Sequence, residues 1–203
     1  MIAIIEPTAT KASAPLYYLK VVLNATKPVI WRRLQVPGNA NLGWLHAVIQ
    51  VAMGWTNSHL HQFTIGNDRY SDPTVDNDLS LGEPADLDEG KITLLEAAPR
   101  EKVEFLYEYD FGDSWEHVVT VEKIHEPDAT SKVLAKCLDG ARACPPDDCG
   151  GIYGYAELLE VINDPEHEEH ESMMEWLGGE FDPDAFSVET VNKYLRKLKW
   201  PRM

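Results

Sequence analysis

Acids, aromatic residues and a histidine gather around one glycine in Y-E-Y-D-F-G-D-S-W-E-H, residues 107–117. The runs on either side have the composition of β-strands, so the stretch is predicted to be the turn of a hairpin. An even-numbered loop, either 111–112 or 111–114, places Glu108, Asp110, Trp115 and His117 on one face. A carboxylate beside an imidazole on that face could bind a metal ion or act as an acid/base pair.

The same stretch also has a purely structural interpretation. Asp110 and Asp113 belong to the residue type that caps a turn by accepting backbone N–H bonds, and Gly112 would supply a positive φ. Trp115 and His117 would then be packing residues. Because Asp and Gly are what such a turn needs in any case, composition favours this interpretation, and the chemistry of the stretch stays open.

Two histidines, His59 and His61, are predicted to share a face, because residues two apart on a strand point the same way. An H-x-H pair on a strand is a workable two-ligand metal site. The neighbouring Leu60 and Phe63 favour two ordinary sheet histidines instead. A shared site would follow if this strand lay beside the hairpin, so that the pair faced Asp110.

Three cysteines, Cys137, Cys144 and Cys149, lie in one loop that is rich in Gly and Pro. One way to hold such a loop is Zn²⁺, with a fourth ligand from a histidine, from Asp147 or Asp148, or from water. The spacing C-x6-C-x4-C matches no standard zinc knuckle, and buried structural thiols are the favoured interpretation, with a redox-labile pair as another. Zn²⁺ is the cofactor that the sequence suggests without requiring it.

Two familiar motifs are excluded. G-D-S at residues 112–114 imitates a serine hydrolase, but it lies at a hairpin and no G-x-S-x-G occurs. Neither G-x-G-x-x-G nor G-x-x-x-x-G-K-[ST] is present, so nucleotide binding has no motif to support it.

The elements that must position these residues follow from hydrophobic periodicity. Apolar alternation predicts strands at residues 17–23, 30–36, 59–65, 103–110 and 115–124. Residues 42–53 are apolar around more than half of a helical wheel, which predicts a buried helix that ends at Gly54. A narrow strip of that helix is small or polar: Gly43, His46, Ala47 and Gln50. Further helices are predicted near residues 155–162, 166–177 and 188–198.

These elements predict an α+β fold, with a mostly antiparallel sheet of about five or six strands, one early buried helix and three C-terminal helices. Residues 67–90 are predicted to be a long exposed loop, and residues 91–97 are either a short strand or a helical turn. We expect a flexible arm over residues 1–15 and a single domain over residues 16–203. That domain is strand-rich over 16–126, holds the cysteine loop over 127–153 and is helical over 154–203.

The composition limits the partners and the cellular location that we expect for this protein. The 203 residues carry a formal net charge of −16, and the acids concentrate between residues 61 and 190. Such a surface repels phosphate backbones, which argues against nucleic acid as a general partner. No apolar run approaches the ~20 residues of a membrane span, and the first residues do not form a signal peptide. Three cysteines, an odd number, then indicate the cytoplasm.

Six strings of the sequence resemble the plasmid pRiA4b ORF-3-like protein family. They are P-V-I-W-R-R-L-Q-V-P (28–37), L-H-A-V-I-Q-V-A-M-G-W (45–55), H-L-H-Q-F (59–63), Y-D-F-G-D-S-W-E-H (109–117), A-C-P-P-D-D-C-G-G-I-Y-G-Y (143–155) and W-L-G-G-E-F-D-P-D-A-F (176–186). The resemblance runs in order over about residues 16–195 and implies an α+β domain. Family labels such as resolvase or repressor do not transfer, because no helix–turn–helix lies beside a basic face.

The leading hypothesis is a cytoplasmic binding or interaction module, associated with plasmid or mobile-element biology, with an unknown protein or small-molecule partner. One alternative is a metal-dependent enzyme that uses His59, His61, Asp110 and His117 around a cation. Another is weak DNA binding through the basic ends, with Arg32, Arg33 and residues 193–202. The most informative observation is whether the strand with His59 and His61 lies next to the hairpin.

Overall fold

The computed structural model describes residues 14–74, 86–126 and 135–200. Most of the expected N-terminal arm, residues 1–13, lies outside the described residues. Within the described ranges the chain forms an α+β fold with one sheet of eight strands and five helices. The predicted fold class is therefore confirmed, whereas the predicted number of five or six strands is too low.

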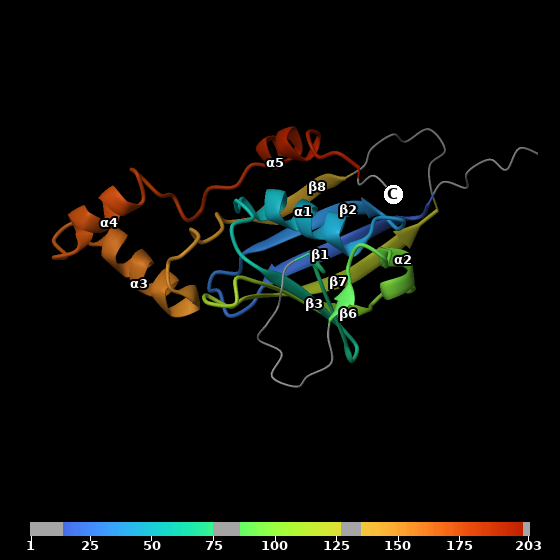
Figure 1. The fold of residues 1–203 in the computed structure, drawn as a ribbon. Coiled ribbons are helices and arrows are strands. Elements are labelled where there is room, and N and C mark those ends of the chain that lie inside the picture. The colour runs from blue at the N-terminus through green and yellow to red at the C-terminus, as the bar shows by residue number, and fades with distance from the viewer. Residues whose placement is uncertain (1–13, 75–85, 127–134, 201–203) are drawn as a thin grey trace, which may run out of the picture.

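The sheet has the strand order β5-β4-β3-β6-β7-β1-β2-β8 (Figure 1). Its neighbours are antiparallel except for the parallel pair β4 and β5. The strands are β1 (Leu16–Leu23), β2 (Trp31–Pro37), β3 (His61–Ile65), β4 (Asp68–Ser71), β5 (Leu87–Asp88), β6 (Glu104–Tyr109), β7 (Trp115–His125) and β8 (Lys136–Ala141). The three unpredicted strands, β4, β5 and β8, lie at or next to an edge of the sheet. Edge strands bury little, so their sequences lack the apolar alternation that marks the central strands.

The helices are α1 (Leu42–Met53), α2 (Leu94–Ala97), α3 (Gly151–Asn163), α4 (His170–Trp176) and α5 (Val188–Leu195). Helix α1 has the predicted bounds. The Asn41 side chain caps it by accepting a hydrogen bond from the Trp44 N–H, and Gly54 ends it with a φ of 106°. Helix α2 decides between strand and helix for residues 91–97, because a capping box between Thr93 and Glu96 starts a helical turn there.

Helix α1 lies across one face of the sheet, and α5 lies beside it over β8 (Figure 1). Helices α3 and α4 extend past one end of the sheet, the end at which the β6–β7 hairpin turns. The side chains that face α1 are fully buried, as at Leu19 and Val21 of β1. The polar strip of α1 carries His46 and Gln50, both also buried. Their polar atoms must therefore find partners inside the protein.

The β6–β7 hairpin has a different register from the predicted one. Tyr109 pairs with Trp115 and Tyr107 with His117, so five residues, 110–114, form the loop. An odd-numbered loop shifts the alternation by one residue. Trp115 and His117 therefore share the buried face with the two tyrosines, whereas Glu108 points to the other face of the sheet. The prediction of Glu108, Asp110, Trp115 and His117 on one face is wrong for this reason.

Candidate functional site

Strand β3 pairs with β6, with His61 opposite Tyr109, so the histidine strand does lie next to the hairpin. The pairing extends one residue beyond β3, because the Asp110 N–H donates a hydrogen bond to the Leu60 carbonyl at 2.8 Å. This contact brings His59 to the hairpin loop. A third segment, the cysteine loop, meets both of them at the same end of the sheet.

Three side chains from these three loops converge. His59 Nε2 lies 3.6 Å from Asp110 Oδ2 and 3.2 Å from Asp148 Oδ1. One ligand atom from each residue lies within 4.8 Å of the other two. In the described part of the chain, this is the only group of three or more His, Cys, Asp or Glu side chains that converges so closely. His59 and Asp110 were both predicted as candidate site residues, whereas Asp148 was expected only as a fourth ligand beside the cysteines.

The two oxygens of Asp110 have separate tasks. Oδ1 accepts hydrogen bonds from the Gly112 N–H at 2.9 Å and the Asp113 N–H at 3.4 Å, so it caps the loop as the structural interpretation expected. Oδ2 is the atom that faces His59. The positive φ values fall at Asp110 (58°) and Ser114 (55°), and not at the predicted Gly112. Asp113 accepts a hydrogen bond from the Gly150 N–H at 3.2 Å and so ties the hairpin to the cysteine loop.

The loop that carries His59 is anchored to helix α1 and to strand β6. The Ser58 N–H donates to the Tyr109 hydroxyl at 3.1 Å, and the Asn57 N–H donates to Gln50 Oε1 at 3.0 Å. Asn57 itself has a φ of 58°, a left-handed conformation that Asn tolerates better than most residues. These contacts fix the backbone on the N-terminal side of His59, because each uses a backbone N–H.

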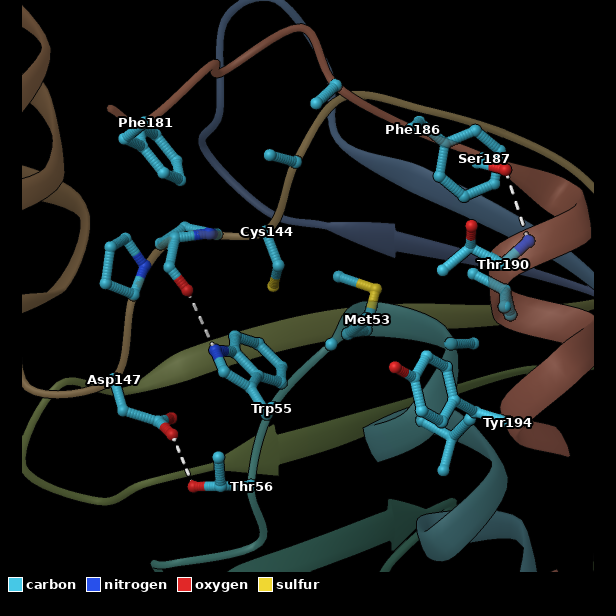
Figure 2. Close-up of a pocket in the computed structure, with 18 of the residues that line it drawn as sticks. Met53, Trp55, Thr56, Cys144, Asp147, Phe181, Phe186, Ser187, Thr190 and Tyr194 are labelled. Carbon is cyan, nitrogen blue, oxygen red and sulfur yellow. Dashed lines mark hydrogen bonds between the residues drawn. The ribbon is translucent and has the colours of Figure 1, made fainter. Parts of the chain in front are cut away.

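Asp147 joins the histidine loop to the cysteine loop. Its carboxylate accepts hydrogen bonds from Thr56 Oγ1 at 2.9 Å and from the Tyr109 hydroxyl at 3.3 Å, and the first of these is drawn in Figure 2. The Trp55 indole N–H donates to the Pro145 carbonyl at 3.0 Å. The neighbouring Asp148 is therefore held near His59 although its own side chain is 72% exposed.

Glycines at the start of α3 let the cysteine loop approach the hairpin. A Cβ at Gly151 would lie 2.5 Å from the Asp113 carbonyl oxygen, and a Cβ at Gly154 would lie 1.9 Å from the Cys149 carbonyl oxygen. Gly151 also has a φ of 66°. A side chain at Gly151 would push the cysteine loop away from the hairpin, and one at Gly154 would collide with the backbone of the cysteine loop at Cys149. Both glycines therefore help to position Asp148.

His59 Nε2 is buried and has no hydrogen-bond partner among the described residues. Its two carboxylate neighbours lie at ion-pair distances but not in hydrogen-bond geometry. Two ligand atoms about 2.1 Å from a tetrahedral cation lie about 3.4 Å apart. The two measured separations bracket that value, so the group fits a shared divalent cation.

A polar cavity of about 450 Å³ opens beside His59. The residues that line it are Gly43, His46, Ala47, Asn57, Ser58, His59, Leu60, His61, Ser71, Asp72 and Glu89. None of these is a lysine or an arginine. The small and polar strip predicted on α1 therefore forms one wall of the cavity. In the sequence, this wall is visible as small and polar residues that interrupt an otherwise apolar helix.

The imidazole of His46 is held neutral in one tautomer. Its Nε2 lies 2.6 Å from the Asn57 Oδ1 carbonyl oxygen and its Nδ1 lies 2.8 Å from the Tyr107 hydroxyl. A carbonyl oxygen only accepts, so Nε2 carries the proton and the tyrosine donates to Nδ1. Gln50 Nε2 in turn donates to that hydroxyl at 2.9 Å. Burial, followed by the nearby His61, lowers the pKa of His46 to about 3.

His61 stacks flat on His46, with ring centroids 3.4 Å apart and an interplanar angle of 6°. Its Nε2 lies 2.7 Å from Glu89 Oε2. Glu89 is 6% exposed and comes from the segment after β5, which was predicted to be an exposed acidic loop. His61 therefore belongs to the cavity and does not join the group of His59, Asp110 and Asp148.

Two other predicted site residues are core residues. Trp115 and His117 are both 0% exposed, so no ligand reaches them. His117 Nδ1 lies 3.2 Å from the Tyr107 carbonyl oxygen, and burial lowers the pKa of this histidine to about 4. The predicted metal site of His59, His61, Asp110 and His117 is therefore wrong in two of its members, because His61 lines the cavity and His117 lies in the core. Glu108, on the other face, accepts a hydrogen bond from Ser114 Oγ at 2.7 Å.

The three cysteines are free thiols, and the converging group contains none of them. Cys137 is buried on β8. Cys144 borders a larger, mostly apolar cavity of about 1040 Å³ between α1, the cysteine loop and α5, where Met53, Phe181 and Tyr194 also lie (Figure 2). Burial raises the pKa of all three thiols, to about 12 for Cys149. They therefore stay protonated at neutral pH in the metal-free protein, as buried structural thiols do.

The arginines offered for DNA binding are engaged inside the protein. Arg32 is 2% exposed and donates to four backbone carbonyls, including those of Ala52 at 2.7 Å and Ala141 at 2.9 Å. Arg33 makes a bidentate ion pair with Glu122 at 2.7 and 3.0 Å. Arg32 is therefore unavailable to a phosphate backbone, whereas Arg33, with a side chain 33% exposed, is already paired with a carboxylate.

The fold and this geometry define a class, an α+β protein whose sheet ends in three loops that bring a histidine and two carboxylates together beside a polar cavity. The chain belongs to the plasmid pRiA4b ORF-3-like protein family, whose sequence model matches residues 15–190. No helix in the described ranges has the length and apolar character to cross a membrane.

Two relatives cover nearly the whole chain. The chain is 37% identical to the uncharacterized protein y4hQ of Sinorhizobium fredii over 188 residues, which are 91% of this chain and 93% of that protein. It is similar to the crystal structure of a protein of unknown function, MM3350 from Methanosarcina mazei Go1. That match has a TM-score of 0.74 and 37% identity, and it covers 86% of this chain and 96% of the other.

Proposed function

We propose that this chain is a cation-dependent binding module in which His59, Asp110 and Asp148 hold a divalent first-row metal ion. The observation that carries the proposal is the convergence of these three side chains around the unpartnered Nε2 of His59. One imidazole nitrogen and two carboxylate oxygens form a donor set that suits Zn²⁺ or Mn²⁺.

Three protein ligands leave at least one coordination position open, which is the pattern of sites that bind a ligand or a water molecule on the metal. His59 also lines the polar cavity, so the proposed site borders a space that can hold a ligand. A metal-dependent enzyme is the second candidate for the same reason, because a bound cation polarises a ligand and lowers the pKa of coordinated water.

The surrounding hydrogen bonds support a preorganised site. Asp110 is oriented by the N–H groups of its own loop, and Asp147 and Asp113 hold the cysteine loop against the other two loops. Outer residues of this kind orient the ligands in metal sites generally. A cation would also offset the repulsion among the several carboxylates gathered here.

The association with plasmid or mobile-element biology rests on the family description, which refers to an open reading frame of a plasmid. A cytoplasmic location is supported by the three free cysteines, because a reducing compartment keeps thiols unpaired.

The proposal is tested by titrating untagged protein with Zn²⁺ and with Mn²⁺ by calorimetry, together with elemental analysis of the purified protein. We expect one site per chain, with at least tenfold weaker binding in H59A, D110N and D148N. H125A, which removes an exposed histidine at the far end of β7, is the matched control and should bind normally. Unchanged affinity in D148N, whose exposed side chain is not needed for folding, would reject the site.

A further inference from the structure

The cavity beside His59 has two chemically different ends. At one end His59 belongs to the proposed cation site. At the other end Glu89 and Asp72 contribute carboxylates, together with the hydroxyl of Ser71. The cavity volume of about 450 Å³ lies within the range that holds small molecules.

One oxygen of Glu89 is available to a ligand. Oε2 is bound to His61 at 2.7 Å, whereas no described residue donates a hydrogen bond to Oε1. Glu89 is 6% exposed, and its Oε1 lies against Gly43, where an added Cβ would come within 2.8 Å of it. Gly43 and Glu89 both line the cavity, so this oxygen borders the cavity space. A carboxylate oxygen there can accept a hydrogen bond from a ligand.

Asp72 adds a second acceptor at the same end. Its Oδ1 accepts hydrogen bonds from the Thr74 N–H at 2.8 Å and the Thr74 hydroxyl at 2.7 Å. These two bonds lower the pKa of Asp72, so its carboxyl group is ionised at neutral pH. The second oxygen has no partner among the described residues.

No fixed positive charge balances these acids in the cavity wall. The lining residues include no lysine or arginine, and His46 is neutral in its network with Asn57 and Tyr107. His61 already directs one nitrogen to Glu89. This end of the cavity therefore favours a positively charged group with several N–H donors and disfavours an anion.

We infer that the ligand is a small zwitterion of amino-acid type, whose ammonium group binds Glu89 and Asp72 while its carboxylate coordinates the cation at His59. The inference rests on the proposed cation site. His59 and His61 are two residues apart, with His59 just before β3, so their Cα atoms lie at most about 7 Å apart. An amino acid can bridge ends separated by such a distance, and the spacing of its two charged groups determines the fit.

The test uses a ladder of amino acids in which that spacing grows: glycine, β-alanine and γ-aminobutyrate. Each is titrated into Mn²⁺-saturated protein by calorimetry, with butyrate and butylamine as matched compounds that each lack one charged group. We expect at least one amino acid to bind at least tenfold more tightly than both matched compounds. E89Q should remove that preference while leaving Mn²⁺ affinity unchanged.

D72N provides a second variant, because its side chain is partly exposed and its replacement does not threaten the fold. It should weaken amino-acid binding in the same direction. Normal Mn²⁺ binding without preference for any amino acid over the one-charge compounds would overturn this inference and leave the cation site standing. Absence of binding of both Mn²⁺ and Zn²⁺ would instead overturn the proposed function itself, and if Zn²⁺ alone binds, the same titrations are made on the Zn²⁺-saturated protein.

Discussion

Two buried neutral histidines should make the protein sensitive to mild acid. Burial lowers the pKa of His117 from 6.5 to about 4 and that of His46 from 6.5 to about 3. The unfolded chain then binds protons in a range where the folded chain does not. Stability is therefore full above about pH 6.5 and falls as the pH decreases toward the folded pKa values.

The size of the effect follows from the pKa values. At about pH 5 an unfolded histidine is almost fully protonated, while both buried rings remain neutral. Each ring then removes about 2 kcal/mol from the free energy of unfolding between about pH 8 and about pH 5. The two together remove about 4 kcal/mol, a large share of the 5–15 kcal/mol typical of folded domains.

Urea unfolding at a series of pH values measures this loss in metal-free buffer. With an m value of about 2 kcal/mol per M, the midpoint should fall by about 2 M urea between the two pH values. H117Q and H46Q should each remove about half of the pH dependence of the unfolding free energy. The exposed histidines are the same in the wild type and in both variants, so they do not affect this comparison. A midpoint that does not change between these pH values, or variants that keep the full dependence, would refute the reasoning.

Four further predictions concern the tyrosine network, the loops and the cation. Y107F should cost about 1–3 kcal/mol in urea unfolding, because two buried partners of the hydroxyl, one on His46 and one on Gln50, lose their hydrogen bond. G151A should destabilise the protein and weaken Zn²⁺ binding, whereas G66A, which has a similar φ of 64° and open space, should cost only about 1 kcal/mol. In chelator-treated protein D148G should be at least as stable as the wild type, since φ at this position is 59°, yet it should lose cation affinity. Zn²⁺ at 100 times its dissociation constant for the wild type should add about 2.7 kcal/mol to the unfolding free energy of the wild type and at most about 1.4 kcal/mol to D148G.

The central part of the fold was predictable because its residues obey simple periodicities. Helix α1 and strands β1, β2, β6 and β7 each bury one regular set of apolar side chains, and their predicted bounds agree with the structure within about two residues. Strands β4, β5 and β8 were not predicted, because pairing with a neighbour, not apolar alternation, makes them strands. The odd number of residues in the β6–β7 loop depends on left-handed backbone conformations at Asp110 and Ser114. The sequence of the turn instead made Gly112 the obvious residue for a left-handed conformation.

The candidate site was predictable only in part. His59 and Asp110 were recognised from residue type and local spacing, and strand pairing then brought them together. Asp148 and Glu89 come from loops whose acids look like ordinary solvated residues in the sequence. Their positions depend on contacts between distant segments, such as the one between Gly151 and the Asp113 carbonyl, which local patterns do not encode.

The backbone conformation adds an argument about why these loops carry polar residues. Asn57, Asp110 and Asp148 all have left-handed φ values between 58° and 59°, where glycine would be the less strained choice by about 1 kcal/mol. Asn57 uses its side chain to hold His46, and Asp110 uses one oxygen to cap its loop. Asp148 forms no such structural hydrogen bond among the described residues, and its carboxylate lies at ion-pair distance from His59. Of the three, Asp148 is therefore the residue whose carboxylate has no structural task in the fold, and the proposed cation would give it one.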